Sequence, residues 1–392
     1  MPPRTLLVIS CLAVLIAQSG ITLYLPSLPS IAEHFHAQPN FQALTLSAFL
    51  AGMGLPMLLW GMVAARWGSR KTLLCALCLF GGSSLFVAVS SDTSMFLTGR
   101  AIQGAAAGGI SVMARVLIRD AFTGKRLAQA LSWLSICFVI SLGLAQFVGA
   151  VLHAAWGWNA IFVTSATLSF LLVLPVRIYV PERANAEPAP RPIRKIYVTL
   201  FQDMRFMRPV LAGGLGYGVV IIFGACAPAI FQQKFDWSVV EYGLIGWPIS
   251  CAYLVGALSV SWLISTRSQE ESLRLGLKFL AAGAVLMSAG PLLFPETANS
   301  LLLPYCILLA GQGIVYPLCQ ALANQNAKIS GPYAMALTVF IHQAIAACCG
   351  LLASVLPPGQ TGPFTVACIT LALAALAIGL REKTKEQASK TV

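Results

Sequence analysis

Apolar residues are concentrated in long continuous runs along this chain, and short polar segments separate the runs. A run of about 20 residues is long enough for a helix to cross roughly 30 Å of hydrocarbon. Because the runs are continuously apolar and do not alternate with a period of two, they predict helices and not the strands of a barrel. We expect twelve membrane-spanning helices, at residues 5–29, 41–65, 72–90, 94–117, 127–152, 159–181, 209–232, 240–265, 272–293, 299–323, 332–356 and 362–380.

The first run resembles a signal peptide, because one arginine precedes an apolar core that ends in small residues. The apolar run continues through "ITLYLPSLP", however, and further runs follow it. We therefore expect an uncleaved first span.

Composition agrees with a polytopic membrane protein. The 392 residues are 58% hydrophobic and 10% charged, whereas a soluble domain has about 25% charged residues. The net charge of +12 does not indicate nucleic-acid binding, because the basic residues fall almost entirely in alternate inter-span segments and the C-terminal tail. This is the positive-inside pattern, which places both termini in the cytoplasm.

The chain divides in its middle, at a segment rich in proline and charge. We expect a first six-helix bundle at 1–181, a cytoplasmic linker at 182–208, a second bundle at 209–380 and a cytoplasmic tail at 381–392. A faint repeat supports two related halves, since Gln103–Gly104 recurs as Gln312–Gly313. The predicted fold class is an all-α polytopic membrane protein with two bundles around a midplane cavity, as in transporters.

Several segments, in order along nearly the whole chain, resemble the major facilitator superfamily. They are "TLYLPSLPSIA" at 22–32, "GMVAARWGSRK" at 61–71, "GRAIQGAAAGG" and "ARVLIRDAF" in and after the fourth span, and "WGWNAIF" and "VPE" around the sixth. The chain looks most like the Bcr/CflA-type multidrug exporters, which include EmrD-like proteins. This resemblance implies an alternating-access carrier in a bacterial inner membrane that exports small amphipathic compounds.

The resemblance also implies a conformational latch in the basic turn after the second span. Its residues here are Gly61, Arg66, Gly68, Arg70 and Lys71. The family has an Asp in this turn where this chain has Ala65, so we expect Asp120, after the fourth span, to supply the countercharge. Alternatively, the three cations are only topology anchors.

Two other departures concern proton antiport. Many relatives carry an acid in the first span at the position of Thr22, although EmrD-like members resemble this chain in having Thr. The antiporter motif of the fifth span normally has two prolines, but this chain has Leu142 and Gln146 there and keeps Gly149. No Asp or Glu is expected at mid-membrane, so protons are only a candidate driving ion.

Two ionisable residues lie deep inside predicted spans, Arg100 and His342. We expect Thr22 and nearby backbone carbonyls of the first span to solvate Arg100, which either couples transport to helix movement or pins two helices together. His342 could exchange protons near neutral pH, because histidine titrates near pH 6.5; the alternative is a neutral imidazole bonded between helices.

The expected substrate path is sparse in polar groups and rich in aromatic ones. Its candidate residues are Gln18, Thr22, Arg100, Gln103, Gln146, Tyr217, Gln312 and Tyr316. Each of them could instead serve as a hydrogen-bonding contact between helices. The set suits neutral or weakly anionic amphiphiles.

The sequence leaves alternatives to drug export. One is the dedicated export of a single metabolite such as a siderophore or nucleoside. A membrane enzyme is disfavoured because the sequence has no H-E-x-x-H, no P-loop and no paired intramembrane carboxylates, and a sensor is disfavoured because the tail is too short for an output domain. We expect a monomer in the lipid bilayer with no cofactor, no metal and no nucleic-acid partner.

Overall fold

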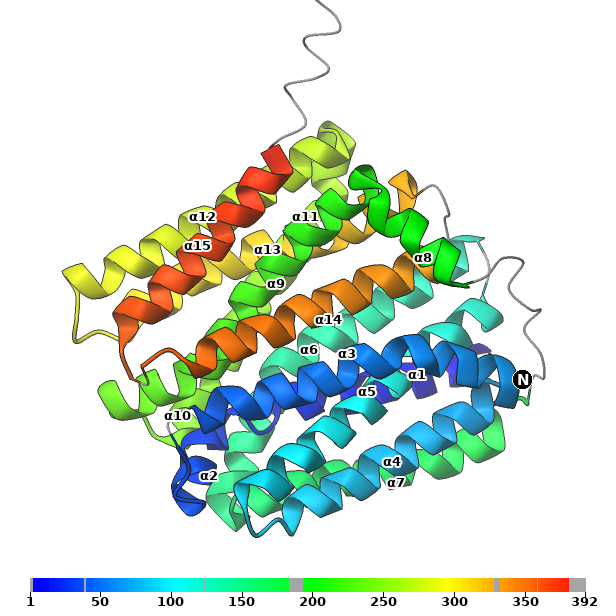
Figure 1. Ribbon diagram of the computed structural model, residues 1–392, viewed down its shortest axis with the longest axis horizontal. Coiled ribbons are helices and arrows are strands. Elements are labelled where there is room, and N and C mark those ends of the chain that lie inside the picture. Colours follow the sequence, from blue (N-terminus) through cyan, green and yellow to red (C-terminus); the bar gives the residue numbers. More distant parts are fainter. Residues whose placement is uncertain are drawn as a thin grey trace, which may run out of the picture. The chain divides into compact units, whose positions relative to one another are not determined.

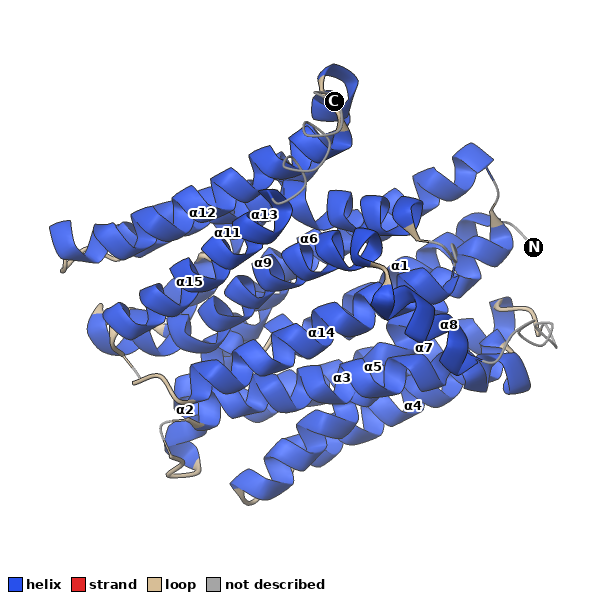
Figure 2. Ribbon diagram, turned by 45° about the horizontal axis from the view of Figure 1, so that its top comes forward, coloured by secondary structure: helices blue, strands red, loops and turns tan. Residues whose placement is uncertain are grey.

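The computed structural model describes residues 3–38, 40–122, 124–182, 193–327, 332–357 and 359–380. All regular structure in this part of the chain is helical, as Figure 2 shows. Eleven of its helical segments are long and apolar enough to cross a membrane. The second predicted span, 41–65, lies inside a further helix, of which Phe41–Gly54 is an apolar stretch. The predicted all-helical, multi-pass class is confirmed.

The first half of the chain contains seven long or short α-helices and one 3₁₀ turn (Figure 1). In order they are α1 (Pro3–Thr22), η1 (Leu25–Ser27), α2 (Leu28–His34), α3 (Phe41–Trp67), α4 (Ser69–Ala88), α5 (Thr93–Ala121), α6 (Gly124–Trp156) and α7 (Trp158–Tyr179). The first predicted span is thus interrupted, because Pro26 has no backbone N–H to continue α1.

The second half begins with a helix that the sequence did not predict, α8 (Ile193–Gln202), which lies in the expected linker. It is followed by α9 (Met204–Ala229), one π-helical turn η2 (Ile230–Lys234), α10 (Val239–Leu244), α11 (Gly246–Thr266), α12 (Gln269–Leu293), α13 (Asn299–Asn326), α14 (Pro332–Ser354) and α15 (Thr361–Leu380). α8 is amphipathic, and it buries Ile196 and Leu200 against residues of α9, α13 and α14.

Local chemistry explains several helix boundaries. The carboxylate of Asp92 accepts a hydrogen bond of 2.8 Å from the backbone N–H of Met95 and so caps the first turn of α5. Ser268 and Glu271 form a reciprocal capping box at the start of α12. Gly68 joins α3 to α4 with a φ of 80°, a conformation that favours glycine.

The chain divides into two compact units. The first contains Met1–Pro188 with Ala225–Ser250 and Gly350–Pro358, and the second contains Ala189–Gly224, Cys251–Cys349 and Gly359–Val392. Two short segments of the second half therefore pack with the first six spans. The predicted bundle boundaries at 181 and 209 remain a prediction.

Within the first unit, residues 225–250 contact η1 and α6. The side chain of Gln232 donates a hydrogen bond of 2.8 Å to the carbonyl oxygen of Pro26. A methyl group added at Gly143 on α6 would lie 2.7 Å from the carbonyl oxygen of Gly246, at the start of α11. α10 also packs against α6 and η1.

A very close crossing of two helices recurs in each of the two units. In the first, α3 crosses α5 so tightly that a methyl group at Gly104 would overlap the carbonyl oxygen of Phe49, and one at Gly52 would overlap that of Ala101. In the second, Gly256 on α11 meets the carbonyl of Ala310 on α13, and Gly313 meets that of Tyr253. The two crossings place the repeated Gln–Gly pairs at matching points of the two halves.

Substitution of Gly104 by Ala should destabilise the protein. The added methyl group meets backbone and not a movable side chain, so we expect a cost of about 1–3 kcal/mol, typical of overpacking. Thermal unfolding of the purified protein in detergent measures it, and the unfolding temperature should fall.

Gly82→Ala on α4 is the matched control, since nothing lies within 4 Å of a methyl group added there. The helix propensity of Ala exceeds that of Gly by roughly 1 kcal/mol, so this variant should be as stable as the parent or more so. Equal destabilisation by both substitutions would contradict the tight crossing.

Candidate functional site

Arg100, on α5, is fully buried in the first unit. One terminal nitrogen of its guanidinium donates a hydrogen bond of 2.9 Å to the carbonyl oxygen of Gly20, near the end of α1. The other donates to the side-chain oxygen of Gln103, one turn further along α5. The described contacts of Arg100 include no carboxylate.

Three aromatic rings lie around the guanidinium of Arg100. Its central carbon lies 4.0 Å from the ring centroid of Tyr24, 4.4 Å from that of Phe49 and 5.9 Å from that of Phe162. A cation over an aromatic face is stabilised by the ring quadrupole, most strongly when both are out of water. Arg100 therefore ties α5 to α1, α3 and α7, and its terminal donors are engaged inside the protein.

Thr22 was expected to solvate Arg100, but its hydroxyl forms hydrogen bonds elsewhere. Its hydroxyl lies 3.1 Å from the carbonyl oxygen of Ser141 on α6 and 3.4 Å from that of Gln18, one turn back on α1. Of the expected first-span groups, the backbone carbonyl of Gly20 is the one that accepts a hydrogen bond from Arg100. Thr22 thus links α1 to α6, while Gly20 links α1 to α5.

Two more candidates of the first unit differ in how their amides are used. The amide nitrogen of Gln103 donates a 2.7 Å hydrogen bond to Ser84 on α4, so Gln103 connects Arg100 to a third helix. Gln146, on α6, is buried, but its side-chain oxygen has no hydrogen-bond partner. Gln18 is buried on α1.

The second unit brings together the remaining candidates on three helices. Tyr217 lies on α9, Gln312 and Tyr316 on α13, and His342 on α14. The ring centroids of Tyr217 and Tyr316 are 6.1 Å apart, and those of Tyr316 and His342 are 5.4 Å apart. We call Tyr217, Gln312, Tyr316, His342 and Gln343 the polar cluster.

The amide of Gln312 is the least satisfied group of the polar cluster. Gln312 is 1% exposed, and in the described part of the chain neither its side-chain oxygen nor its nitrogen has a hydrogen-bond partner. The side-chain oxygen of Gln343 and Nδ1 of His342 are also buried without one. Buried polar atoms are nearly always paired, so these atoms are suited to a bound polar group or water.

His342 is held by the backbone of α9. Its Nε2 lies 3.0 Å from the carbonyl oxygen of Val210, and because a carbonyl can only accept, Nε2 carries the hydrogen. A neutral imidazole then leaves Nδ1 as an acceptor within the cluster. This geometry agrees with the structural alternative for His342, and a role in proton coupling stays a prediction.

The basic turn has a countercharge that was not predicted from the sequence. The ammonium group of Lys71 lies 2.8 Å from a carboxylate oxygen of Glu182, just after α7. This hydrogen bond and the charge of Lys71, with a smaller contribution from Arg70, lower the pKa of Glu182 below its ordinary value. Asp120 remains a predicted partner for Arg66 and Arg70, and the surroundings of Gly61 lie outside the described residues.

Sequence reasoning missed several of these contacts for identifiable reasons. Gly20 acts through its carbonyl, which leaves no mark in a side-chain pattern. Tyr24 and Phe49 look like ordinary apolar positions until the fold places them over Arg100. Glu182 had a usable signal, because it is the acid of the quoted "VPE" segment at the same membrane side as the basic turn.

Comparison with known proteins now adds to this geometry. The sequence profile described as Major Facilitator Superfamily matches residues 10–347. The chain is 29% identical over 276 residues to an uncharacterized MFS-type transporter, YdgK, of Bacillus subtilis, and the match covers 69% of each chain. It is also 29% identical over 243 residues to the multidrug resistance protein MdtL of Escherichia coli, where the match covers 61% of each chain and so less than two thirds of MdtL.

A solved structure shows the same fold at low sequence identity. The crystal structure of a D-xylose-proton symporter superposes with a TM-score of 0.76, covering 95% of this chain and 97% of the other. At 16% identity this likeness concerns the fold alone.

Replacing Arg100 by Lys should weaken both stability and transport. A single ammonium cannot reach Gly20 and Gln103 with the planar spacing of a guanidinium, and each hydrogen bond to a charged group contributes about 1.5–3 kcal/mol. We expect a clear fall in unfolding temperature and at least a roughly tenfold loss of transport rate. The control is Arg177→Lys, at an exposed position near the end of α7. An Arg100→Lys protein as stable as the parent would contradict the pinning role.

The pairing of Lys71 with Glu182 predicts a pH dependence. Because the pKa of Glu182 is lower in the folded protein than in the unfolded chain, its contribution is present at neutral pH and is lost as pH falls through that lowered pKa. The unfolding temperatures of the parent and Glu182→Gln should therefore differ at pH 7 and converge in acid.

A charge swap tests the same pair without relying on pH. Glu182→Lys alone should reduce transport about two- to fivefold, since exposed pairs contribute little, and Lys71→Glu with Glu182→Lys should restore part of it. Strictly additive effects of the two reversals would show that the groups do not act as a pair.

Proposed function

The chain belongs to the major facilitator superfamily, and on that premise we propose that this multi-pass membrane transporter exports small, neutral amphipathic compounds out of a bacterial cell. Export would proceed by alternating access between the bundles at 1–181 and 209–380. The observation that carries the proposal is the polar cluster, where buried amide and imidazole atoms that lack hydrogen-bond partners lie beside two tyrosines.

The chemistry of the polar cluster favours neutral substrates. Gln312, Gln343 and His342 offer both donors and acceptors, and Tyr217 and Tyr316 offer aromatic surfaces. Such a site suits an apolar compound that carries one or two hydrogen-bonding groups. Arg100 was expected to attract weak anions, but it is fully buried and each of its two terminal nitrogens donates a hydrogen bond inside the first unit, which leaves only Nε without a partner among the described residues. We therefore do not include Arg100 in the proposed site.

The relatives support export of drug-like compounds. MdtL is named a multidrug resistance protein. Drug-like compounds are also the substrate class that the polar cluster suits. A dedicated exporter of a single metabolite would use the same fold, so the number of compounds that compete for transport distinguishes the two.

Alternating access also needs contacts that can separate. In the first unit, Gln232 of η2 holds the carbonyl of Pro26, and α10 and the start of α11 pack closely on α6. These contacts lie at span ends opposite the basic loops, which the positive-inside pattern places outside the cell. We propose that they close the outer side and part when substrate is released.

Proton antiport is the proposed driving mechanism, with His342 as the candidate carrier. Support for His342 is positional, since it is buried in the second unit beside Tyr316 and within the polar cluster. A proton would have to reach Nδ1, because Nε2 is bonded to Val210.

Uptake into inverted membrane vesicles tests the proposed function. With both termini cytoplasmic, an exporter should accumulate labelled amphipathic compounds inside such vesicles when an acid-inside pH gradient is imposed. Removal of the gradient by a protonophore should abolish accumulation, and His342→Gln should do the same while leaving downhill exchange. Accumulation that ignores the pH gradient would contradict antiport, and absence of any uptake or exchange across a chemically varied panel would contradict export.

Two glutamines at matching positions provide the sharper prediction. Gln312→Leu removes an amide that has no hydrogen-bond partner among the described residues, so stability should not fall, but KM should rise about three- to tenfold for the loss of one substrate hydrogen bond. Gln103→Leu removes the contacts to Arg100 and Ser84, so it should lower the unfolding temperature. A stable Gln312→Leu protein with unchanged KM would remove Gln312 from the substrate path.

A further inference from the structure

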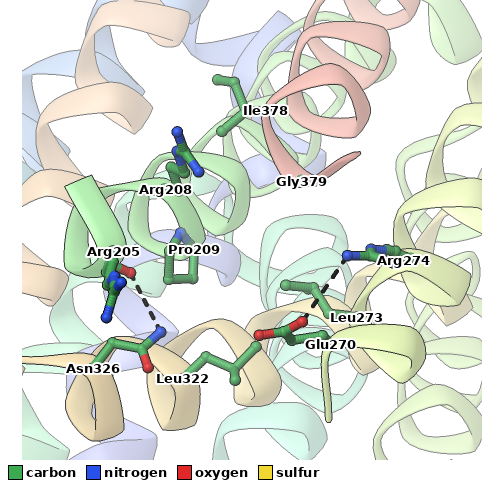
Figure 3. Close-up of a pocket in the computed structure, with 10 residues that line it drawn as sticks. All are labelled: Arg205, Arg208, Pro209, Glu270, Leu273, Arg274, Leu322, Asn326, Ile378 and Gly379. Carbon is green, nitrogen blue, oxygen red and sulfur yellow. Dashed lines mark hydrogen bonds and ion pairs between the residues drawn. The ribbon is translucent and has the colours of Figure 1, made fainter. Parts of the chain in front are cut away.

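A pocket opens in the second unit where four helices end, and no transport role has been assigned to it. It encloses about 430 Å³, including its open mouth. Figure 3 shows its lining: Arg205, Arg208, Pro209, Glu270, Leu273, Arg274, Leu322, Asn326, Ile378 and Gly379. These residues come from the starts of α9 and α12 and the ends of α13 and α15.

Positive charge dominates the pocket. Three arginines against one glutamate leave a net charge of two positive units. Figure 3 shows Arg205 and Arg208 on one side of the opening and Arg274 on the other. Asp203 accepts a hydrogen bond from the backbone of Arg205 but does not line the pocket.

The one acid of the lining only partly neutralises Arg274. The two charged groups are 3.9 Å apart at their nearest atoms, which is long for an ion pair. Glu270 is 53% exposed, whereas Arg274 is only 16% exposed and its Nε is buried without a hydrogen-bond partner. A half-buried guanidinium with an unused donor is suited to an incoming anion, because arginine can bind two phosphate oxygens at once.

The position of the pocket points to a lipid as the source of that anion. All four helix ends are on the side of the basic loops, which the positive-inside pattern places at the cytoplasmic surface of the membrane. Apolar side chains of Leu273, Leu322 and Ile378 line the pocket together with the arginines. A soluble anion gains nothing from these apolar groups, whereas a phospholipid brings phosphate and hydrocarbon together.

The neighbouring surface has the same mixed character. Val198 and Phe201 on α8 and Met204 at the start of α9 are 45%, 47% and 55% exposed, and Met204 directly precedes Arg205. Large exposed apolar groups beside arginines are typical of a helix lying at the boundary between headgroups and acyl chains.

We propose that this pocket binds the phosphate of an anionic phospholipid, with Arg208 and Arg274 as its main ligands and Glu270 as a competing acid. Basic pockets between membrane helices on the cytoplasmic side are suited to such headgroups. The proposal is independent of the transported substrate.

Native mass spectrometry of the purified full-length protein tests it, with phosphatidylglycerol and phosphatidylcholine as probes. The parent protein should retain phosphatidylglycerol in preference to phosphatidylcholine. Arg208→Gln and Arg274→Gln should each weaken phosphatidylglycerol retention about fivefold, the effect of one basic side chain near a membrane surface. Arg177→Gln, which removes an arginine outside the pocket, is the matched control and should leave retention unchanged.

A variant that is expected to bind the lipid more tightly distinguishes the proposed site from variants that weaken binding only because they fold poorly. Glu270→Gln removes the competing carboxylate, so it should strengthen phosphatidylglycerol retention severalfold. Equal weakening by Arg177→Gln and the pocket variants would show non-specific attraction and overturn the proposal. Displacement of phosphatidylglycerol by millimolar inorganic phosphate would also overturn it, because the site would then take a soluble anion.

Discussion

The close crossing of two helices in each half is the contact on which the rest of the structure depends. Lipid tails are as apolar as leucine, so burial of apolar surface does not drive membrane helices together, and close packing at small residues takes its place. At these crossings Gly52 and Gly104, and in the second half Gly256 and Gly313, let one backbone touch another. Each crossing also fixes a glutamine, because Gln103 and Gln312 directly precede the glycines that make the contact.

The two halves use this shared geometry for different chemistry. Arg100 precedes Gln103 by one turn, and the corresponding residue of the second half is Leu309, which is buried. Gln103 is therefore occupied by a guanidinium and by Ser84, whereas Gln312 has no cation beside it and its amide is unpaired. The first repeat pins helices together, whereas the polar atoms of the second repeat are those that we propose for the substrate.

Hydropathy was enough to predict the apolar, membrane-spanning helices, because hydrocarbon tolerates little else, but it gave no signal for α8 in the linker. The Gln–Gly repeat indicated two related halves, but that it marks the close crossings became apparent only from the structure. A backbone carbonyl of the first span was predicted as a partner of Arg100, but the particular carbonyl, that of Gly20, and the rings of Tyr24 and Phe49 could not be predicted from side-chain patterns. The basic pocket was out of reach for another reason: Arg205, Arg274 and Gly379 are far apart in the chain and meet only after the second unit folds.

The position of Arg100 in the chain suits the order in which the protein is synthesised. A lone arginine at the centre of a helix opposes membrane insertion by about 2.5–3.5 kcal/mol on the mildest scale. The carbonyl of Gly20 that receives it lies 80 residues earlier, and Tyr24 and Phe49 also precede it. Because synthesis runs from the N-terminus, α1 and α3 are made before α5. The groups that solvate the guanidinium are therefore already in the membrane when α5 is inserted.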